Sequence, residues 1–568
     1  MTDTTASTAR RDRMLRRQAA LWTERSSWDT HWLEVSRYVL PRAGRFQVTE
    51  ANKGAKKDQS IYDSTGRFAL RTLAAGMMSG VTSPARPWFR LALSDKALME
   101  FGPVKQWLHQ VAELMRAVFA SSNAYNALHS CYEELGAFGT WACVVEPDFD
   151  NIIHLHPLTV GEYALSCNDK GQVDTLVRRL NMTVGQVVKA FGLENCSGAV
   201  QSLYANNTLD AWVQVMHTIE PRADLDSSKL DSKNMPWSSI YLEIGSNEGK
   251  FLRESGFKRF PVLAPRWVIT GNDTYGRSPG MDALGDVKQL QHSSLRKAQA
   301  IDLKVNPPLQ VPSALKDKAN ARMPGGISYF DGNGPGSGIR SAYEVNLDLN
   351  HLLMDIQDNR ERIKQAFYAD LFLLLSNDTR SGITATEVAE RHEEKLLMLG
   401  PVLERLQNEL LSPLIDITFD RLLETGVLPE IPQELRDAGI NNIDIEFVST
   451  LAQAQRAVAT TGMERLFNTT MAMAQVKPDI LDKLDFDQAV DDYAEAQGVN
   501  PALVVPDDKV AEIRAARQQQ QAAMTAAAAA PTMADTAKTA SEINVDNMRD
   551  VMSGLQGYAT SSPAFTGA

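Results

Sequence analysis

Cysteine is scarce in this 568-residue chain, and the four that occur are widely spaced. Cys131, Cys143, Cys167 and Cys196 match neither the CxxC spacing of a structural zinc site nor the dense pairing of a small disulfide-rich protein. We therefore expect four free, unreactive thiols in a reducing compartment.

Long apolar runs are missing as well. No stretch approaches the roughly 18 apolar residues that a membrane-spanning helix needs, and no apolar secretory segment follows the N-terminal arginines. These arginines are Arg10, Arg11, Arg13, Arg16 and Arg17. The sequence thus predicts a soluble, cytoplasmic protein. We expect the arginines to form a solvated helix face; contact with a phosphate backbone or an acidic partner is the alternative.

An excess of positive charge is also absent. The chain has 58 Lys and Arg against 70 Asp and Glu, a formal net charge of −12. Tight, nonspecific binding of nucleic acid requires the opposite balance, so any contact with DNA must be local or weak. A length of 568 residues with 43% hydrophobic content is instead typical of a globular protein with several domains.

Motifs for catalysis and cofactor binding are mostly lacking. There is no GxxxxGK[ST] phosphate loop, the glycine-rich run 331–340 does not join a strand to a helix, and RHEEK has Leu396 where a metalloprotease needs histidine. The acidic run 485–492 lacks an EF-hand glycine and reads as a helix start. His154 and His156 share one face of a predicted strand, but no neighbouring residue completes a metal site. We expect no enzyme, cofactor or metal.

Hydrophobic periodicity predicts both helices and strands in the first half of the chain. Trp28, Trp32, Val35 and Val39 lie on one face of a helix over about 8–40, which Pro41 ends. Further helices are predicted at about 61–80, 104–121 and 124–138, and strands at 140–148, 151–158, 210–220 and in a hairpin, SSIYLEI to KFLRES, with its turn at Gly249.

The second half is predicted to be mostly helical. A helix over 279–305 ends at Pro307 and Pro308, a glycine-rich region follows, and a long helix covers 347–375. The remaining predicted elements are a helix over 384–424 bent at Gly400-Pro401 and Ser412-Pro413, a strand through Ile443, Ile445 and Phe447, helices at about 450–475, 478–497 and 507–530, and a disordered tail.

A short polar loop separates two of these helices. Ser376 to Gly382 follow the apolar seam of the first helix, and Thr384 with Glu387 forms a capping box that starts the next. The sequence therefore predicts a loop that is anchored at both ends.

One segment, residues 58–93, has the pattern of an architectural joint. Ala69, Leu73, Ala74 and Met77 form a narrow helix stripe, and Gly76 permits close backbone approach. Prolines stiffen the exit, and two aromatic residues can anchor it in a core. The turn reads G-x-T-S-P-x-R-P-W-F, with Gly80, Thr82, Ser83, Pro84, Arg86, Pro87, Trp88 and Phe89.

This segment closely resembles the signature of the portal, or head-to-tail connector, proteins of short-tailed double-stranded DNA bacteriophages. A second segment, 267–290, resembles the family's approach to its first stem helix, with Tyr275, Gly276, Gly280 and Leu284 at matching places. The order of elements extends the resemblance from about residue 10 to 530.

The resemblance implies an α+β, predominantly α-helical portal fold with wing, stem, clip and crown. Its regions are the wing (1–278), first stem helix (279–305), clip (306–346), second stem helix (347–375), channel loop (376–383), long wing helix and return strand (384–449), helical crown (450–530) and disordered tail (531–568).

The resemblance also implies a homo-oligomeric ring, typically of twelve subunits, at one capsid vertex of the virion. Such a ring conducts double-stranded DNA during packaging and ejection, and its partners are terminase, capsid and scaffolding protein, and head–tail adaptor and tail proteins. Assembly in the host cytoplasm, without a membrane, is expected. A DNA-processing enzyme or a monomeric scaffold of the phage head is the alternative.

The polar loop is the expected place of DNA contact. Its residues are Ser376, Asn377, Asp378, Thr379, Arg380, Ser381 and Gly382. Arg380 is predicted to make transient phosphate contacts; pairing with an acidic neighbour is the alternative.

Overall fold

The computed structural model describes most of the chain. The described residues are 2–46, 57–93, 95, 98, 101–226, 228–229, 231–246, 248–312, 327–330, 340–341, 349–376, 399–438, 443–447, 462–463, 465–474, 480, 484–497, 503–505 and 509–524. The chain divides into two compact units, 1–464 and 465–568. Predicted features at 377–398, including Thr384 and Glu387, and at 525–568 lie outside the described residues.

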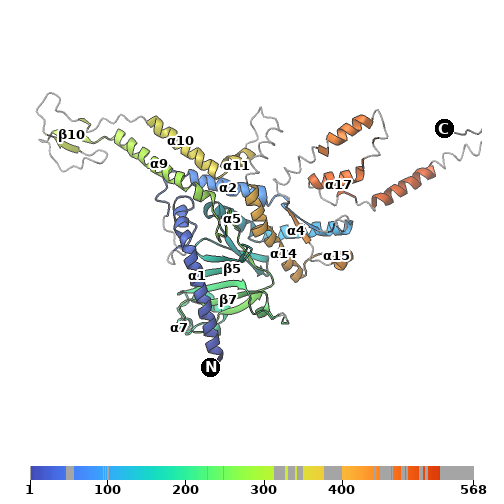
Figure 1. Ribbon diagram of the computed structural model, residues 1–568, viewed down its shortest axis with the longest axis horizontal. Coiled ribbons are helices and arrows are strands. Elements are labelled where there is room, and N and C mark those ends of the chain that lie inside the picture. Colours follow the sequence, from blue (N-terminus) through green and yellow to red (C-terminus); the bar gives the residue numbers. More distant parts are fainter. Residues whose placement is uncertain are drawn as a thin grey trace, which may run out of the picture. The chain divides into compact units, whose positions relative to one another are not determined.

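The N-terminal helix α1 (Thr2–Tyr38) lies along a five-stranded sheet (Figure 1). Its predicted apolar face is confirmed, since Trp32, Val35 and Val39 are fully buried. Nearer the N-terminus, Met14 and Leu21 pack onto apolar residues of the sheet. The helix therefore forms one wall of the first unit.

Three helices make the centre of the core, close to their predicted positions: α2 (Thr65–Val81), α4 (Gly102–Ser121) and α5 (Ala124–Phe138). A short strand, β1 (Phe89–Leu93), follows α2 and pairs antiparallel with β13 (Ile443–Phe447), so the predicted strand at 443–447 is confirmed. This pairing joins segments that are far apart in sequence, because Phe89 stands opposite Phe447, 358 positions later.

Two antiparallel sheets complete the body of the first unit. The smaller has the order β3-β2-β9, with β2 (Ala142–Asp148), β3 (Ile152–Leu158) and β9 (Val262–Leu263). The larger has the order β4-β5-β6-β7-β8, and its strands are β4 (Tyr163–Cys167), β5 (Val173–Thr183), β6 (Trp212–Pro221), β7 (Trp237–Glu243) and β8 (Arg253–Phe257).

Several parts of the larger sheet were not predicted. Strand β5 carries Arg178 and Arg179, which obscure its apolar pattern, although Arg178 is buried. The β7–β8 connection is longer than the predicted turn at Gly249, and Gly245 has the left-handed backbone (φ 90°). The insertion between β5 and β6 holds α6 (Val184–Phe191), η2 (Leu193–Asn195) and α7 (Gly198–Ala205), and η3 (Ser232–Asn234) precedes β7.

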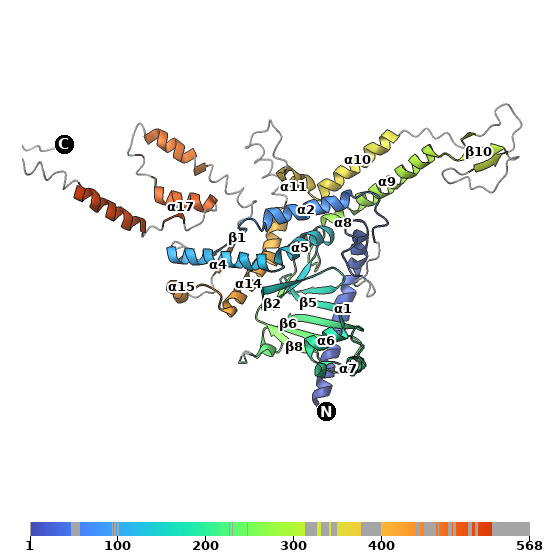
Figure 2. The same ribbon diagram turned by 180° about the vertical axis from the view of Figure 1, so that it is seen from behind.

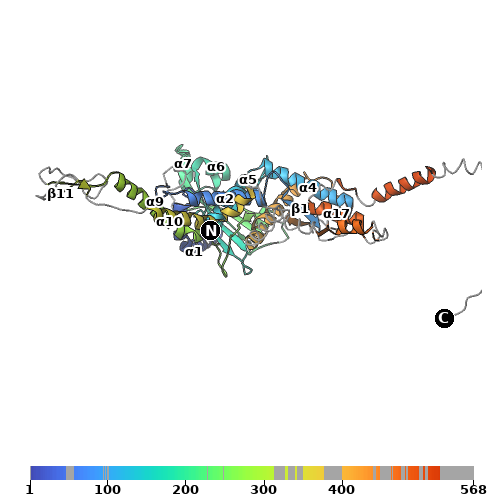
Figure 3. The same cartoon turned by 90° about the horizontal axis from the view of Figure 1, so that it is seen from above.

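The predicted helix at 279–305 is confirmed as α8 (Pro279–Asp282) and α9 (Leu284–Val305). Strands β10 (Leu309–Pro312), β11 (Ile327–Phe330) and β12 (Arg340–Ser341) follow, in the order β11-β10-β12. Helix α10 (Leu349–Ala366) returns beside α9, and Figure 3 shows the two side by side.

The prediction of one continuous helix over 347–375 is wrong. The helix is interrupted at Tyr368, which has φ 55°, and α11 (Ala369–Ser376) begins at the next residue. Neither glycine nor proline marks this break in the sequence.

The helix expected to bend near Pro413 does change its hydrogen bonding there. After α13 (Gly400–Leu406), residues Gln407–Leu411 form a π-helical turn in which the Ser412 amide donates to the Gln407 carbonyl. Pro413 has no N–H for the ordinary bond to residue 409, which accounts for the wider turn. Helix α14 (Ser412–Thr425) and α15 (Gln433–Ala438) follow.

The second unit is helical at 465–474, at α17 (Phe486–Gln497) and at 509–524. Phe467 and Phe486 have ring centroids 6.1 Å apart, and Arg514 makes two hydrogen bonds of 2.6 and 2.7 Å to Asp487. The acidic run is a helix start as predicted, because Asp485 accepts from the amides of Asp487 and Gln488.

Candidate functional site at the signature helix

The residues just before α2 fasten this helix to α9. The side-chain oxygen of Gln291 accepts from the amides of Tyr62 (2.7 Å) and Asp63 (2.8 Å), and its nitrogen donates to the Asp63 carbonyl (2.8 Å). Gln291 is only 4% exposed. One glutamine thus satisfies three backbone groups in a protected place.

The Asp63 side chain extends the joint to α10. Arg360 donates from Nε (3.1 Å) and a terminal nitrogen (2.8 Å) to one carboxylate oxygen, and Thr65 donates from its amide and hydroxyl to the other. Burial acts to raise the pKa of Asp63, but the bonds from Thr65 and Arg360 outweigh it and hold that pKa below its ordinary value. Asp63 is therefore ionised and joins α2, α9 and α10.

Helix α2 is packed tightly along its predicted stripe. Ala69, Leu73, Ala74 and Met77 are all buried. Gly76 faces α11, since a Cβ added there would lie 2.1 Å from Cγ of Phe372. The prediction that Gly76 permits close approach is thus confirmed, and Figure 2 shows α2 beside α10 and α11.

The signature turn after α2 is anchored by its aromatic and hydroxyl groups. Trp88 and Phe89 are buried with ring centroids 4.6 Å apart, and Trp88 stacks on Phe119. Thr82 is fully buried and its hydroxyl lies 2.9 Å from that of Tyr132. Pro84, Arg86 and Pro87 are exposed, Ser83 and Gly80 are half-buried, and Arg86 donates to the Ser79 carbonyl.

The second matching segment packs on the end of α5. Gly276 donates its amide to the Thr140 hydroxyl (2.7 Å), and a Cβ on Gly280 would lie 2.8 Å from the Ala137 carbonyl oxygen. Tyr275 contacts the ring of Trp32 and accepts from the Leu165 amide. Leu284 is buried. These residues fix the start of α9 on the same core as α2.

An ion pair that the sequence did not reveal connects this segment to the π-helical turn. Arg266 is 2% exposed and binds Glu409 through its amide (2.9 Å) and through a terminal nitrogen (2.6 Å). It also donates to the Gly171 carbonyl. The widened turn presents Glu409 to Arg266, and no local pattern in the sequence relates two residues so far apart.

The structure brings one carboxylate to the predicted histidine pair. Glu146 stands opposite His154 in the ladder, and one oxygen lies 3.4 Å from Nε2 of His156. Its other oxygen accepts from Arg178 (3.0 Å). Burial acts to raise the pKa of Glu146, but the bond to His156 first, and then the charge of Arg178, hold it at about 2. Within the described residues there is no cluster of three or more groups fit to hold a metal.

Near Glu146, a buried histidine lies beside a serine hydroxyl. The two resemble a catalytic pair, but the histidine ring is oriented wrongly for that role. Arg178 donates to Nδ1 of His217 (2.9 Å), so the proton of the neutral ring is on Nε2, which faces the Ser239 hydroxyl at 2.9 Å. Burial first, and then Arg178, lowers the pKa of His217 well below its ordinary value. The ring therefore donates to Ser239 and cannot accept its proton.

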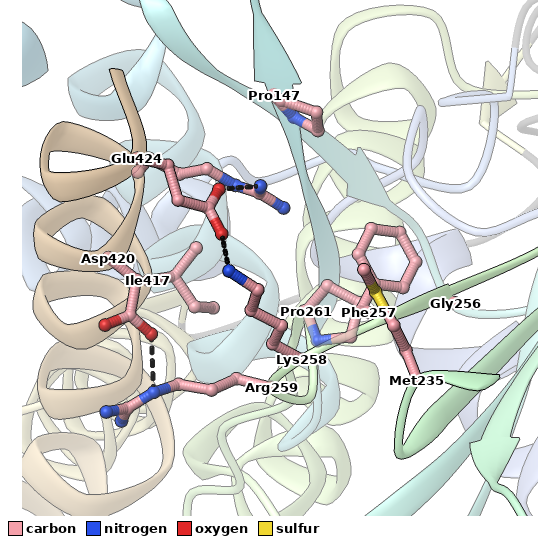
Figure 4. A pocket seen from close by; sticks show the side chains of 11 residues that line it. Pro147, Met235, Gly256, Phe257, Lys258, Arg259, Pro261, Ile417, Asp420 and Glu424 are labelled. Carbon is pink, nitrogen blue, oxygen red and sulfur yellow. Dashed lines mark hydrogen bonds and ion pairs between the residues drawn. The ribbon is translucent and has the colours of Figure 1, made fainter. Parts of the chain in front are cut away.

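A cavity of about 220 Å³ lies between the β8–β9 connection and α14 (Figure 4). Lys258 binds Glu424 at 2.6 Å, Arg259 binds Asp420 at 2.6 Å, and Arg421 also binds Glu424. Every cation at the rim thus has an acidic partner, and the arrangement fastens the strands to α14 rather than offering charge to an anion.

Three of the five N-terminal arginines differ from both predictions. Arg10 pairs with Glu254 (2.6 Å), Arg17 pairs with Glu220 (2.9 Å), and Arg11 is buried and donates to the Glu243 carbonyl. These three arginines dock α1 on the larger sheet. Only Arg13 and Arg16 of the cluster are exposed without an ion pair to an acidic side chain in the described part of the chain.

The four thiols are free, as predicted, and three of them are buried. Burial raises the pKa of Cys131 and Cys143 strongly and that of Cys196 to about 11, which disfavours the reactive thiolate form. None of the helices in the described ranges combines the length and apolar composition needed to cross a membrane. Of the predicted channel loop, only Ser376 is described, at the end of α11; 377–382 lie outside.

The fold and the contacts of Asp63 and Gln291 define a structural protein that is α+β and predominantly helical. In this protein, α2 fastens α9 and α10 to a body that contains two sheets. A "Probable portal protein" of Bordetella phage BPP-1 is 53% identical over 96% of this chain and 98% of its own length. The "Portal protein" of Salmonella phage epsilon15 is 44% identical over 94% of this chain and 95% of its own.

The family model described as "Bacteriophage head to tail connecting protein" matches residues 11–505. The chain belongs to this family and has the function of a phage portal protein, the head-to-tail connector of the virion. Among solved structures, the neck of a native gene transfer agent particle, computed with C12 symmetry, aligns with 77% of this chain and 90% of its own at 11% identity and a TM-score of 0.35.

Proposed function

We propose that this portal protein assembles as a ring, typically of twelve copies, at one vertex of the capsid. The ring is the conduit for double-stranded DNA during packaging and ejection. It binds terminase during packaging and head–tail adaptor and tail proteins afterwards, while its outer part contacts capsid and scaffolding protein. Assembly takes place in the host cytoplasm.

In this proposal the body (1–278) is the wing, α9 and α10–α11 are the two stem helices, and 306–346 is the clip. Residues 376–383 are the channel loop, 384–449 the long wing helix and return strand, and 450–530 the crown. Residues Ser376 to Gly382, with Arg380 among them, contact DNA as it passes.

The joint at Asp63 is the observation that carries the proposal. A channel wall built from many copies needs its helices held at one tilt relative to the body, and Asp63 with Gln291 binds both long helices at that point. The charges of α10 also suit a wall along which DNA slides. Arg360, Arg362 and Lys364 each have an acidic partner, so this helix presents no row of free cations to phosphate.

Images of the purified full-length protein in negative stain test this assignment. Rings with a central hole and a countable number of subunits are expected. Compact monomers at the same concentration would contradict the conduit, and a metal- or ATP-dependent nuclease activity would favour a DNA-processing enzyme instead.

A further inference from the structure

The hairpin between β2 and β3 presents an aromatic ring to solvent. Phe149 is fully exposed, more than any other large apolar side chain in the ranges that the structure describes. It lies in the loop 149–151, which the pair Asp148 and Ile152 closes. Single exposed apolar residues are common and need no explanation. This one differs because the loop that carries it is held in place from both sides.

Two features fasten the loop. The Asp148 carboxylate accepts from the amide (3.2 Å) and from the side-chain nitrogen (3.3 Å) of Asn151. Ile152 has φ 68°, a left-handed conformation that glycine or asparagine usually supplies and that a β-branched residue rarely adopts. The Ile152 side chain packs against the main core, which offsets the unfavourable backbone. The Phe149 ring therefore stands on a fixed support, which lowers the entropy that binding a partner costs.

The cavity shown in Figure 4 begins two residues before Phe149, because Pro147 is part of its lining. The other apolar residues that line it are Met235, Phe257, Pro261 and Ile417. Its volume of about 220 Å³ is below the roughly 300–1,000 Å³ of a small-molecule site. A single side chain from a partner protein suits this space better than a small ligand does.

The charge around the hairpin loop and the cavity is acidic overall. Five carboxylates stand against three cations: Asp148, Asp150, Asp416, Asp420 and Glu424 against Lys258, Arg259 and Arg421. Within the described residues, neither Asp148 nor Asp150 has an ion pair with a cation. This excess of negative charge favours a partner that brings lysine or arginine. The loop, the cavity and these charges are here called the hairpin face.

We propose that the hairpin face binds a basic segment of a second structural protein of the phage particle. The segment places one apolar side chain in the cavity and contacts the Phe149 ring, while its lysines or arginines pair with Asp148 and Asp150. An aromatic anchor beside a pocket that excludes water carries much of the free energy in contacts of this kind. That the partner is a particle protein rests on the proposed function, whereas the chemistry of the segment rests on the hairpin face.

Photo-crosslinking from position 149 tests the proposal in assembled particles. The full-length protein, with Phe149 replaced by the photoreactive residue p-benzoylphenylalanine, is produced during phage growth, and the crosslinked peptides are identified by mass spectrometry. A crosslink to one Lys- and Arg-rich segment of another particle protein is expected. A crosslink to a second copy of this chain, to DNA or to an acidic segment would overturn the proposal, as would the absence of any crosslink.

Substitutions in the crosslinking protein test the charge and the cavity separately. Asp150→Lys reverses a charge of the hairpin face, and Met235→Trp fills the cavity from its half-buried wall. Each is expected to lower the yield of the crosslink about tenfold. Asp169→Lys, in the exposed turn between β4 and β5, is the matched control and should leave the yield unchanged. Equal yields from Asp150→Lys and Asp169→Lys would overturn the proposal.

The charge test remains decisive if Met235→Trp does not fold, because Asp150 lies in an exposed loop. Ring images of the same proteins separate this proposal from the proposed function. Rings with an unchanged crosslink in Asp150→Lys would refute the docking site alone. Monomers of the unsubstituted protein, together with a charge-dependent crosslink to a basic segment, would refute the ring and leave the hairpin face standing.

Discussion

Glu134 shows at the residue scale how burial sets the chemistry of a single group. It is 7% exposed on α5, and burial raises its pKa to about 8, although hydrogen bonds from Thr159 and Val160 act in the opposite direction. The nearby carboxyl of Glu162 raises it further. The folded protein therefore keeps Glu134 protonated at neutral pH, while the unfolded chain does not.

This difference predicts a pH dependence of stability. Because folding binds a proton between the ordinary carboxyl pKa and about 8, the free energy of unfolding should fall as pH rises through that window, on the order of several kcal/mol in total. Glu134→Gln mimics the protonated form and should be more stable than the wild type at pH 8.5 but similar at pH 5. Urea unfolding of both proteins at the two pH values measures this difference in the free energy of unfolding.

Glu133→Gln is the control for this prediction, since Glu133 neighbours Glu134 on α5 but is only half-buried. Its stability should follow the wild type at both pH values. Equal pH slopes for Glu134→Gln and the wild type would show that the Glu134 carboxyl does not carry the effect.

At the scale of elements, the joint at Asp63 connects three helices through few groups. Arg360→Gln removes the charged partner of a carboxylate whose side chain is 8% exposed. The free energy of unfolding should fall by about 1–3 kcal/mol, because a mostly buried charge loses its hydrogen bonds. Since the pKa of Asp63 is lowered, this contribution should be present above the ordinary carboxyl pKa and vanish as pH falls through the folded value.

Arg362→Gln is a matched control on the same helix. Arg362 pairs with Asp286 at 3.7 Å and with Asp358, which is 68% exposed, so its loss should cost less than about 1 kcal/mol. Thermal unfolding of both variants at pH 7 checks the contrast. An equal loss from the two substitutions would mean that the Asp63 joint is no stronger than a surface pair.

Elements also differ in how far the sequence predicts them. Helices α2, α4 and α5 lie near their expected positions because apolar residues recur with helical spacing. Strand β5 was missed because Arg178, a charged residue inside the sheet, is balanced by Glu146 from another strand. The break at Tyr368 was missed because no glycine or proline marks it, and the neighbouring contact of Phe372 with Gly76 joins residues almost 300 positions apart in sequence.

At the scale of the whole molecule, the channel loop remains a prediction that only function can test. Shortening 376–382 should leave rings intact but should impair packaging or retention of DNA. Arg380→Ala should show a milder loss of the same kind if the side chain contacts phosphate.

Genome content of purified heads, with ring images of the same variant as the control, measures this outcome. Heads filled to the normal level would contradict a role of the loop in handling DNA. Loss of rings would show instead that the segment is needed for assembly.

The sequence by itself determined the family, through the signature after α2 and the 267–290 segment, and it determined most helices through hydrophobic periodicity. It also indicated the buried aromatic anchor at Trp88 and Phe89. Tertiary structure alone decided which distant groups meet: Gln291 with the backbone at Asp63, Arg266 with Glu409, and Phe372 with Gly76. The physical reason is that local conformation depends on neighbouring residues, whereas a buried charge or a bare glycine is explained only by the partner that the fold brings to it.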